Sequence, residues 1–317
     1  MAIRPYIEIA RIDHWFKNAF MVLGIVVAIF FEPSLLSVSA LPTLALAVVS
    51  TCLVASSNYV LNEILDAPYD GMHPVKRNRP VPAGQVNIPL AYLQWLLLAL
   101  AGFGIGLCVN TPFTVTAIIL WVMGCVYNVR PFRTKDIPYL DVITESINNP
   151  LRLLLGWFAL IDDRLPQSSL VLSYWGLGAF FMGTKRYAEL RMIGDREKAA
   201  HYRRSFAHYT ESNLLTSMMF YITACAFFGG VFTVRSKAEL VLSVPFLATM
   251  FAFYLRLGMK ENSPVQNPEK LYKERGFFAF SLLSFVIFVA LMFTEIPILY
   301  EWFRFDPPKL APLWVIG

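Results

Sequence analysis

Four side chains with amide or carboxylate oxygens recur at every fourth position of one segment: Asn58, Asn62, Asp66 and Asp70. On a helix this spacing places them on one face. Pro68 is expected to break or kink that helix just before Asp70, which leaves the last carboxylate at a helix end or in a loop. Mg²⁺ takes one or two carboxylates together with phosphate oxygens. The stripe, with Glu63 beside it, is therefore a candidate magnesium site, and the alternative is a solvated helix end with an Asx cap.

A basic, proline-rich stretch follows the acids directly. It runs from His73 to Gly84 and holds three cations within four residues, Lys76, Arg77 and Arg79. Arginine can bind phosphate oxygens with two hydrogen bonds, and lysine acts as a point charge. Acids for a metal beside bases for phosphate are the arrangement that a magnesium-bound diphosphate requires. Cations that only set membrane topology would not need this juxtaposition.

The composition indicates that these residues sit in a membrane protein. The chain is 56% hydrophobic and only 15% charged, whereas soluble domains carry about 25% charged residues. The apolar residues form blocks of about 20 residues, enough to cross a bilayer as helices. The head lacks a cleavage site after its first apolar run, so we expect that run to be retained. The sequence predicts an all-α membrane protein with one domain over residues 1–317.

The lengths and charges of the connections predict the topology. We expect nine spans, at about residues 15–31, 42–64, 88–109, 112–129, 138–161, 168–188, 213–234, 238–257 and 276–299. The N-terminal head and the long polar connections, at about 65–87, 130–137, 189–212 and 258–275, hold 21 of the 27 Lys and Arg residues. The positive-inside rule places them in the cytoplasm and the C-terminus on the opposite side of a bacterial-type inner (plasma) membrane.

The end of the second expected span resembles a motif of the UbiA-type prenyltransferase superfamily. The motif Asn-Asp-x-x-Asp-x-x-x-Asp is matched from Asn62 to Asp70, with Glu63 in place of the usual Asp. His73-Pro74, Arg79-Pro80 and the regions 127–135 and 141–156, which include Lys135 and Asp141, also look like this family. The resemblance covers nearly the whole chain. It implies a nine-helix bundle with cytoplasmic loops capping a central cavity, Mg²⁺ as cofactor, and a diphosphate and a polyprenyl lipid as substrates.

The sixth expected span ends differently from the aromatic prenyltransferases of that family. Those end in Tyr-Ala-x-x-Asp-x-x-Asp-Asp, whereas this chain has Lys185-Arg186-Tyr187-Ala188-Glu189. This string, the basic loop and the head around Lys17 are similar to the decaprenyl-phosphate phosphoribosyltransferase subgroup. That resemblance implies transfer of 5-phosphoribose from phosphoribosyl diphosphate (PRPP) to a polyprenyl phosphate. Lys185 and Arg186 would then hold additional phosphate, with Tyr187 near the substrate and Glu189 near the metal; the alternative is membrane anchoring at a helix end.

Two further charged regions admit two interpretations each. The fifth span carries Asp141, Glu145, Asn149 and Arg152 on one helical face. They form either a wall of the substrate site or a structural ion pair that satisfies Arg152. The segment 191–211 mixes charges of both signs and is either a solvated cytoplasmic helix or a lid.

The leading hypothesis is a magnesium-dependent glycosyl transfer. Asp66, Asp70 and Asn62 would hold the metal on the leaving diphosphate, and the cations would stabilise phosphate charge. No general base is required because a lipid phosphate is already anionic. The alternative is a UbiA-type prenyltransferase that moves a polyprenyl group from its diphosphate to an aromatic or lipid acceptor. A transporter is disfavoured because no internal repeat is visible; we expect no nucleic-acid partner, and a homo-oligomer remains open.

Overall fold

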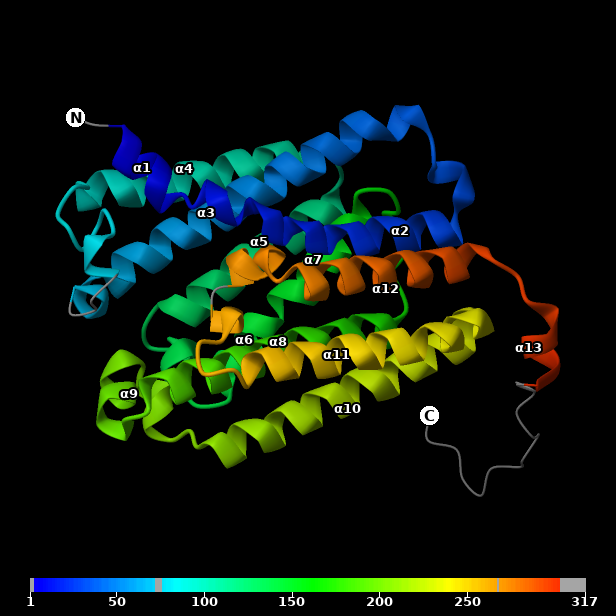
Figure 1. The fold of residues 1–317 in the computed structure, drawn as a ribbon. Coiled ribbons are helices and arrows are strands. Elements are labelled where there is room, and N and C mark those ends of the chain that lie inside the picture. The colour runs from blue at the N-terminus through cyan, green and yellow to red at the C-terminus, as the bar shows by residue number, and fades with distance from the viewer. Residues whose placement is uncertain (1–2, 72–75, 267, 303–317) are drawn as a thin grey trace, which may run out of the picture.

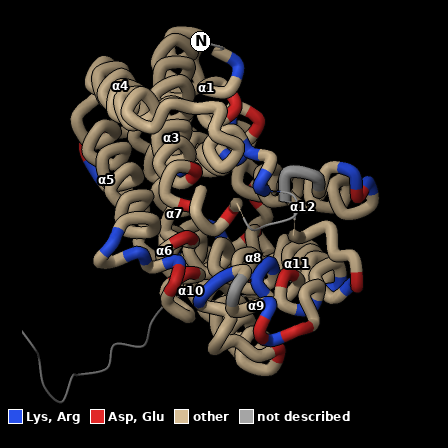
Figure 2. The backbone as a smooth tube through the Cα atoms, turned by 90° about the vertical axis from the view of Figure 1, so that its left-hand side faces the viewer, with Lys and Arg blue, Asp and Glu red and all other residues tan. Residues whose placement is uncertain are grey.

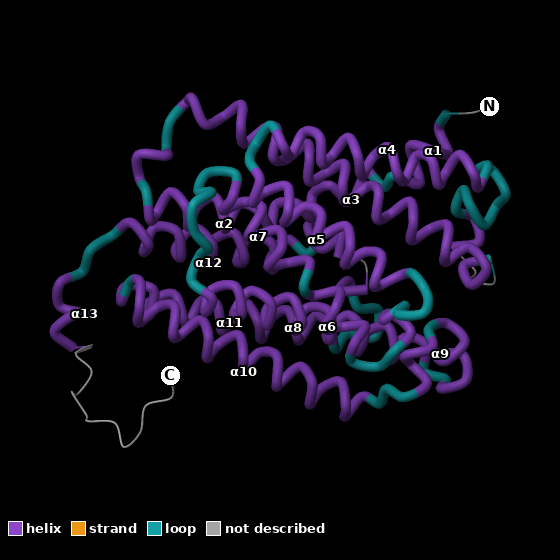
Figure 3. The backbone as a smooth tube through the Cα atoms, turned by 180° about the vertical axis from the view of Figure 1, so that it is seen from behind, coloured by secondary structure: helices purple, strands orange, loops and turns teal. Residues whose placement is uncertain are grey.

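The computed structural model describes residues 3–71, 76–266 and 268–302, and these are helical with no strand among them. His73, Pro74 and the C-terminal tail lie outside the described residues. The first half contains α1 (Arg4–Ile9), the 3-10 helix η1 (Ile12–Phe20), α2 (Met21–Phe31), α3 (Leu41–Asp70), α4 (Ile88–Leu107) and α5 (Thr111–Asn128). The second half contains α6 (Leu140–Ser146), α7 (Asn148–Phe158), α8 (Ser168–Ile193), α9 (Arg196–Tyr202), α10 (Glu211–Ser236), α11 (Val244–Gly258), α12 (Arg275–Phe293) and α13 (Pro297–Trp302). The long helices lie side by side along one direction (Figure 1, Figure 3).

Seven helical stretches of the described chain are long and apolar enough to cross a membrane. They are Arg4–Phe31, Val38–Asp70, Ile88–Leu107, Thr111–Asn128, Glu211–Ser236, Ala238–Gly258 and Arg275–Phe293. Large apolar side chains such as Leu97 and Leu100 on α4 are exposed, as lipid-facing positions require. The prediction of a multi-pass, all-α membrane protein is therefore confirmed.

The two remaining expected spans correspond to α6 with α7, and to α8. The first is interrupted between Ser146 and Asn148, where Pro150 has no N–H to donate to the carbonyl of Ser146. The last turns of α8 carry Lys185, Arg186, Glu189 and Arg191. The count of nine spans and their orientation stay predictions.

Two glycines bring α2 and α7 into backbone contact. A Cβ atom on Gly24 would lie 2.0 Å from the carbonyl oxygen of Leu153, and one on Gly156 would lie 2.0 Å from that of Met21. Small residues allow this approach between helices in a membrane. The contact fixes α7 against the N-terminal segment.

The charged connections gather at one end of the bundle. The segments joining α3 to α4, α5 to α6 and α8 to α10 lie at the end that also carries α1, and α13 lies at the other (Figure 1). Viewed from that end, acidic and basic residues crowd together there (Figure 2). Pro68 does not break α3, which continues to Asp70 as its last residue; the expected position of Asp70 at a helix end is confirmed. Helix α3 thus carries the polar stripe into the charged end.

Candidate active site

The two asparagines of the stripe connect α3 to α5. The amide nitrogen of Asn58 donates to the carbonyl oxygen of Leu120 at 3.0 Å, and that of Asn62 donates to Oδ1 of Asn128 at 2.6 Å. Asn58 also packs against Gly124, where a Cβ atom would lie 2.2 Å from its Cγ. Both amides therefore hold the helix that presents the acids.

Asp66 is surrounded by cations from the connection between α5 and α6. Its Oδ1 accepts from Nη2 of Arg133 at 3.0 Å and from Nζ of Lys135. Asn128 holds both cations, through its backbone oxygen at 2.9 Å from Arg133 Nη1 and its Oδ1 at 2.8 Å from Lys135 Nζ. Burial lowers the pKa of Lys135 to about 8, although the charge of Asp66 opposes the shift.

Asp70 lies beside the basic loop that the sequence pairs with it. Nη1 of Arg79 donates to its Oδ2 at 2.6 Å, and Nζ of Lys76 lies 3.7 Å from its Oδ1. Arg77 is exposed. Burial lowers the pKa of Lys76, and the charges of Asp70 and Glu189 oppose the shift. Lys76 therefore lies beside the last turn of α3, within electrostatic range of Glu189 on α8.

A second acid, Asp141 at the start of α6, is fully buried. Its Oδ2 accepts from Nε of Arg186 at 2.9 Å and from the hydroxyl of Ser205 at 3.3 Å. Its Oδ1 accepts from the hydroxyl of Tyr209 at 2.5 Å. Asp141 thus joins α6, α8 and the segment after α9, rather than facing an open space.

The Lys185-Arg186 pair divides into two different environments. Arg186 is buried, and it donates to Glu189 Oε2 at 3.0 Å and to the hydroxyl of Tyr127 at 3.3 Å in addition to Asp141. A quarter of the Lys185 side chain is exposed, and its Nζ lies 3.9 Å from Glu189 Oε1. Lys185 is therefore the better placed of the two to meet a ligand.

Arg203 also belongs to this site, although the sequence did not single it out. Its Nη1 donates to Tyr127 at 3.3 Å and lies 3.6 Å from Asp141 Oδ2. The charge of Arg203 also contributes to lowering the pKa of Lys76 and of Lys135. Arg203 therefore lies beside Tyr127 and Asp141, within electrostatic range of Lys76 and Lys135. The segment 191–211 contacts this end of the bundle through Arg203, Ser205 and Tyr209, while residues 194–198 are exposed; the choice between a solvated helix and a lid stays a prediction.

The other expected site residues, Glu63, Lys17 and Tyr187, contact different partners from those of Asp66 and Asp70. Glu63 is buried, accepts from the backbone N–H of Val81 at 3.3 Å, and lines a hollow of about 600 Å³. The Lys17 ammonium lies 5.7 Å from the ring centroid of Tyr59. Tyr187 donates to Glu211 Oε2 at 3.2 Å.

The ion pair that one of the two interpretations assigns to Arg152 is not formed among the described residues. Nε of Arg152 donates to Oδ1 of Asn18 at 3.1 Å, and Nη1 donates to the backbone oxygen of Asn148 at 3.3 Å. Asp141, on the same expected helical face, pairs with Arg186 instead. The interruption between α6 and α7 separates the two halves of that face.

The donor set fits a magnesium ion that is completed by substrate. Asp66 and Asp70 provide two carboxylates one helical turn apart, and Mg²⁺ typically takes one or two together with phosphate oxygens and water. No group of three or more His, Cys, Asp or Glu side chains in the described chain could hold a metal ion. Glu63 and Glu189, expected as further ligands, have other partners in this structure, Val81 and Arg186.

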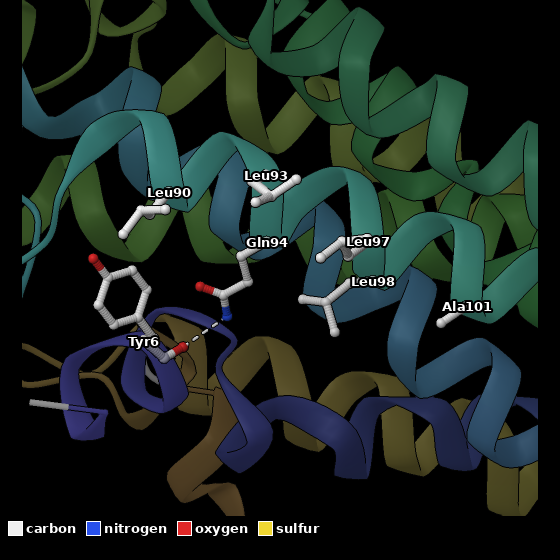
Figure 4. Close-up of a pocket in the computed structure, with 7 residues that line it drawn as sticks. All are labelled: Tyr6, Leu90, Leu93, Gln94, Leu97, Leu98 and Ala101. Atoms are coloured by element: carbon white, nitrogen blue, oxygen red, sulfur yellow. Dashed lines mark hydrogen bonds between the residues drawn. The ribbon is translucent and has the colours of Figure 1, made fainter. Parts of the chain in front are cut away.

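A separate apolar groove of about 470 Å³ lies between α1 and α4. Figure 4 shows its lining, in which Nε2 of Gln94 donates to the backbone oxygen of Tyr6 at 2.8 Å. The remaining lining residues are Leu90, Leu93, Leu97, Leu98 and Ala101. No charged side chain lines this groove, so it does not suit a phosphate.

The long apolar helices and the charged end form an all-helical membrane-embedded bundle. The chain belongs to the UbiA prenyltransferase family, which matches it over residues 19–282. It is 32% identical over 211 residues to the decaprenyl-phosphate phosphoribosyltransferase of Mycolicibacterium smegmatis, covering 66% of this chain and 63% of that one. It is 30% identical to the enzyme of the same name from Corynebacterium glutamicum, covering 66% of this chain and 60% of that one. The alignments thus span less than two thirds of both relatives.

Solved structures share the fold. A UbiA homolog from Archaeoglobus fulgidus, bound to GPP and Mg²⁺, has a TM-score of 0.68 at 17% identity and covers 92% of this chain and 100% of that one. A digeranylgeranylglyceryl phosphate synthase has a TM-score of 0.65 at 14% identity, with 92% and 98% covered. The all-helical UbiA fold expected from the sequence is therefore confirmed.

Proposed function

We propose that this protein transfers 5-phosphoribose from PRPP to a polyprenyl phosphate and releases diphosphate, with Mg²⁺ as cofactor. The names of its relatives from Mycolicibacterium smegmatis and Corynebacterium glutamicum support this reaction, and the magnesium in the Archaeoglobus fulgidus homolog supports the cofactor. The observation that carries the proposal is an excess of cations at one end of the bundle, where six lysines and arginines share four acids, Asp66, Asp70, Asp141 and Glu189. Lys76, Arg79, Arg133, Lys135, Lys185 and Arg203 all lie at the charged end.

That excess of positive charge matches the proposed substrates. A prenyl diphosphate presents one diphosphate group, whereas PRPP presents a diphosphate and a 5-phosphate, and the lipid adds a third group. Each phosphate group can accept several charge-assisted hydrogen bonds. A site for all three needs more lysines and arginines than a prenyltransferase site.

Asp66 and Asp70 would hold the metal, with Asn62 fixing their helix against α5. Bound Mg²⁺ would neutralise charge that develops on the leaving diphosphate. Lys76 and Arg79, which pair with Asp70 in this structure, would contact the diphosphate oxygens once the carboxylate binds the metal. Lys185 and Arg203 would face the remaining phosphate charge.

The reaction breaks the bond between ribose C1 and the diphosphate oxygen, and forms a bond from C1 to an oxygen of the lipid phosphate. The electron pair of the broken bond leaves with diphosphate. The cations stabilise charge on the leaving group and hold both substrates in register. No side chain has to remove a proton. The charged end would face the cytoplasm, where a water-soluble donor reaches it.

The test is a donor competition in membranes that contain the protein. Labelled PRPP with polyprenyl phosphate should give a labelled phosphoribosyl lipid, and excess polyprenyl diphosphate should not replace PRPP. Turnover of the prenyl diphosphate with an aromatic acceptor, without any phosphoribosyl lipid, would instead establish the prenyltransferase alternative.

A further inference from the structure

Arg152 is a buried cation with no carboxylate partner. Its side chain is on α7, and the residue is only 8% exposed. Both of its hydrogen bonds, to Asn18 and to the backbone of Asn148, go to uncharged oxygens. Within the described chain, no Asp or Glu oxygen lies within the 4.0 Å of an ion pair. In this respect Arg152 differs from Arg186, whose charge is balanced by two acids.

An uncompensated charge in the interior of a membrane bundle is costly. Ionisable residues inside membrane segments are rare, face the bundle interior and pair with another group. A buried guanidinium left without a counter-ion loses its hydration and gains little in return. The close backbone contact between Gly156 and Met21 keeps α7 in place, so Arg152 does not escape to the surface by a small helix movement. No carboxylate of the described chain forms an ion pair with Arg152, although Glu145 is within electrostatic range of the same Tyr59, so the guanidinium is able to bind an anion from outside the protein.

Arg152 lies deeper in the bundle than the acid pair. Its partner Asn18 directly follows Lys17, whose ammonium lies over the ring of Tyr59 at 5.7 Å. Tyr59 precedes Asp66 on α3 by seven residues, which is two helical turns or about 10 Å along the axis. Tyr59 is also within electrostatic range of Arg152. The two cations therefore both lie near Tyr59, two turns of α3 before Asp66, and Lys17 is also within electrostatic range of Lys185.

The depth of Arg152 in the bundle indicates which substrate would supply the anion. A water-soluble donor reaches the acids from the loop end, whereas an anionic group at the level of Tyr59 is most easily delivered by a lipid whose chain lies among the helices. In a direct displacement at a sugar carbon, the attacking oxygen approaches from the face opposite the leaving group. The two reacting phosphates therefore need separate sites, one on each side of the ribose.

We propose that Arg152 and Lys17 bind the phosphate of the polyprenyl phosphate acceptor, deeper in the bundle than the metal-bound diphosphate. This inference rests on the proposed function, because it assigns the second substrate of that reaction. Arg152 would take two phosphate oxygens through its guanidinium, and Lys17 would add a point charge. Asn18 would keep the guanidinium oriented.

Binding measurements on the purified protein test the assignment without requiring turnover. Polyprenyl phosphate and the matching uncharged polyprenol are added to the protein in detergent micelles, and bound lipid is measured by native mass spectrometry. PRPP with Mg²⁺ is titrated separately by calorimetry. We expect Arg152→Gln to weaken polyprenyl phosphate binding by at least ~10-fold, which corresponds to about 1.4 kcal/mol. Polyprenol and PRPP binding should not change.

The matched control is Arg164→Gln. Arg164 is an exposed arginine that pairs with Glu32 and Asp163, and its replacement should leave binding of polyprenyl phosphate at the wild-type level. If Arg152→Gln does not fold, Lys17→Gln decides, because it removes the second cation from a partly exposed helix. The inference is overturned if folded Arg152→Gln protein binds polyprenyl phosphate as tightly as the wild type does. If Arg152→Gln does not fold, the same result with Lys17→Gln overturns it.

The proposed function fails in a different way. If the wild-type protein binds polyprenyl phosphate through Arg152 but does not bind PRPP with Mg²⁺, the lipid-phosphate site stands and the phosphoribosyl donor is wrong. If PRPP binds but loss of Arg152 leaves lipid binding intact, the donor assignment stands and the acceptor site lies elsewhere.

Discussion

The guanidinium of Arg186 and the carboxylate of Asp141 form a buried ion pair, with Nε and Oδ2 2.9 Å apart and side chains only 2% and 0% exposed. The pair links α8 to α6. Tyr209 and Ser205 donate to the same carboxylate, so the segment after α9 is attached to it as well. A buried pair of this kind is costly to break, because the remaining charge is left without its partner.

Replacement of Asp141 by Asn should therefore destabilise the fold. The amide cannot balance the charges of Arg186 and Arg203, and we expect a loss of about 3–5 kcal/mol in the free energy of unfolding. Thermal unfolding of the purified protein in detergent measures the change. Asp163→Asn is the control, since Asp163 is exposed and pairs only with its neighbour Arg164. If Asp141→Asn is as stable as the control, the Asp141–Arg186 ion pair does not stabilise the fold.

Asp66→Asn should abolish magnesium-dependent turnover. Loss of one charged metal ligand removes stabilisation of the leaving diphosphate, and we expect activity to fall by at least ~100-fold. Initial rates of transfer are measured over a range of Mg²⁺ concentrations, and a sample with chelator gives the rate without Mg²⁺. Asp136→Asn serves as the matched control, because Asp136 pairs with the same Arg133, at 3.0 Å from its Nε, but is not proposed to hold the metal. Equal rates and equal Mg²⁺ dependence in the two variants would remove Asp66 from the metal site.

Lys185→Gln should weaken donor binding without unfolding the protein. Its ammonium is partly exposed and makes one long contact with Glu189, so its loss leaves no buried charge unpaired. We expect KM for PRPP to rise about 10-fold, the effect of losing about 1.4 kcal/mol of binding. Steady-state kinetics and thermal unfolding are measured together. An unchanged KM would place Lys185 outside the donor site, as the membrane-anchoring interpretation holds.

Gly156→Ala should separate α7 from the N-terminal segment. The new Cβ atom would lie 2.0 Å from the carbonyl oxygen of Met21, so the backbones must move apart at a cost of about 1–3 kcal/mol. Gly104→Ala is the control within a helix, because nothing lies within 4 Å of its Cβ position and alanine favours helix. Thermal unfolding should show a loss for the first variant and no loss for the second. Equal stabilities would mean that the two helices are not in contact as described.

The helices and the acid stripe could be predicted because both depend on local spacing. Apolar blocks of about 20 residues specify spans, and a four-residue period specifies one helical face. The pairing of Asp70 with Lys76 and Arg79 could also be predicted, because these residues are near neighbours in the sequence. Asp70 lies at the end of α3, as expected, but Pro68 does not break the helix before it, because a proline in the last turn removes only one hydrogen bond close to the helix end.

The remaining partners depend on tertiary packing. Arg133 meets Asp66 from 67 positions away, and Tyr209 meets Asp141 from 68. Arg203 lies in a segment whose mixed charges resemble any solvated helix, so no sequence pattern marks it as part of the site. The same limit applies to Arg152, whose lack of a carboxylate partner is visible only when all its neighbours are in place.

The central claim is tested most directly with the purified protein in lipid vesicles. PRPP, polyprenyl phosphate and Mg²⁺ are supplied together, and the lipid extract is analysed by mass spectrometry. The account predicts a lipid heavier than the acceptor by one 5-phosphoribosyl group, with release of one diphosphate per product, and no such lipid from Asp66→Asn or in the presence of chelator. Unmodified polyprenyl phosphate in every reaction of an otherwise folded protein that binds both substrates would contradict it.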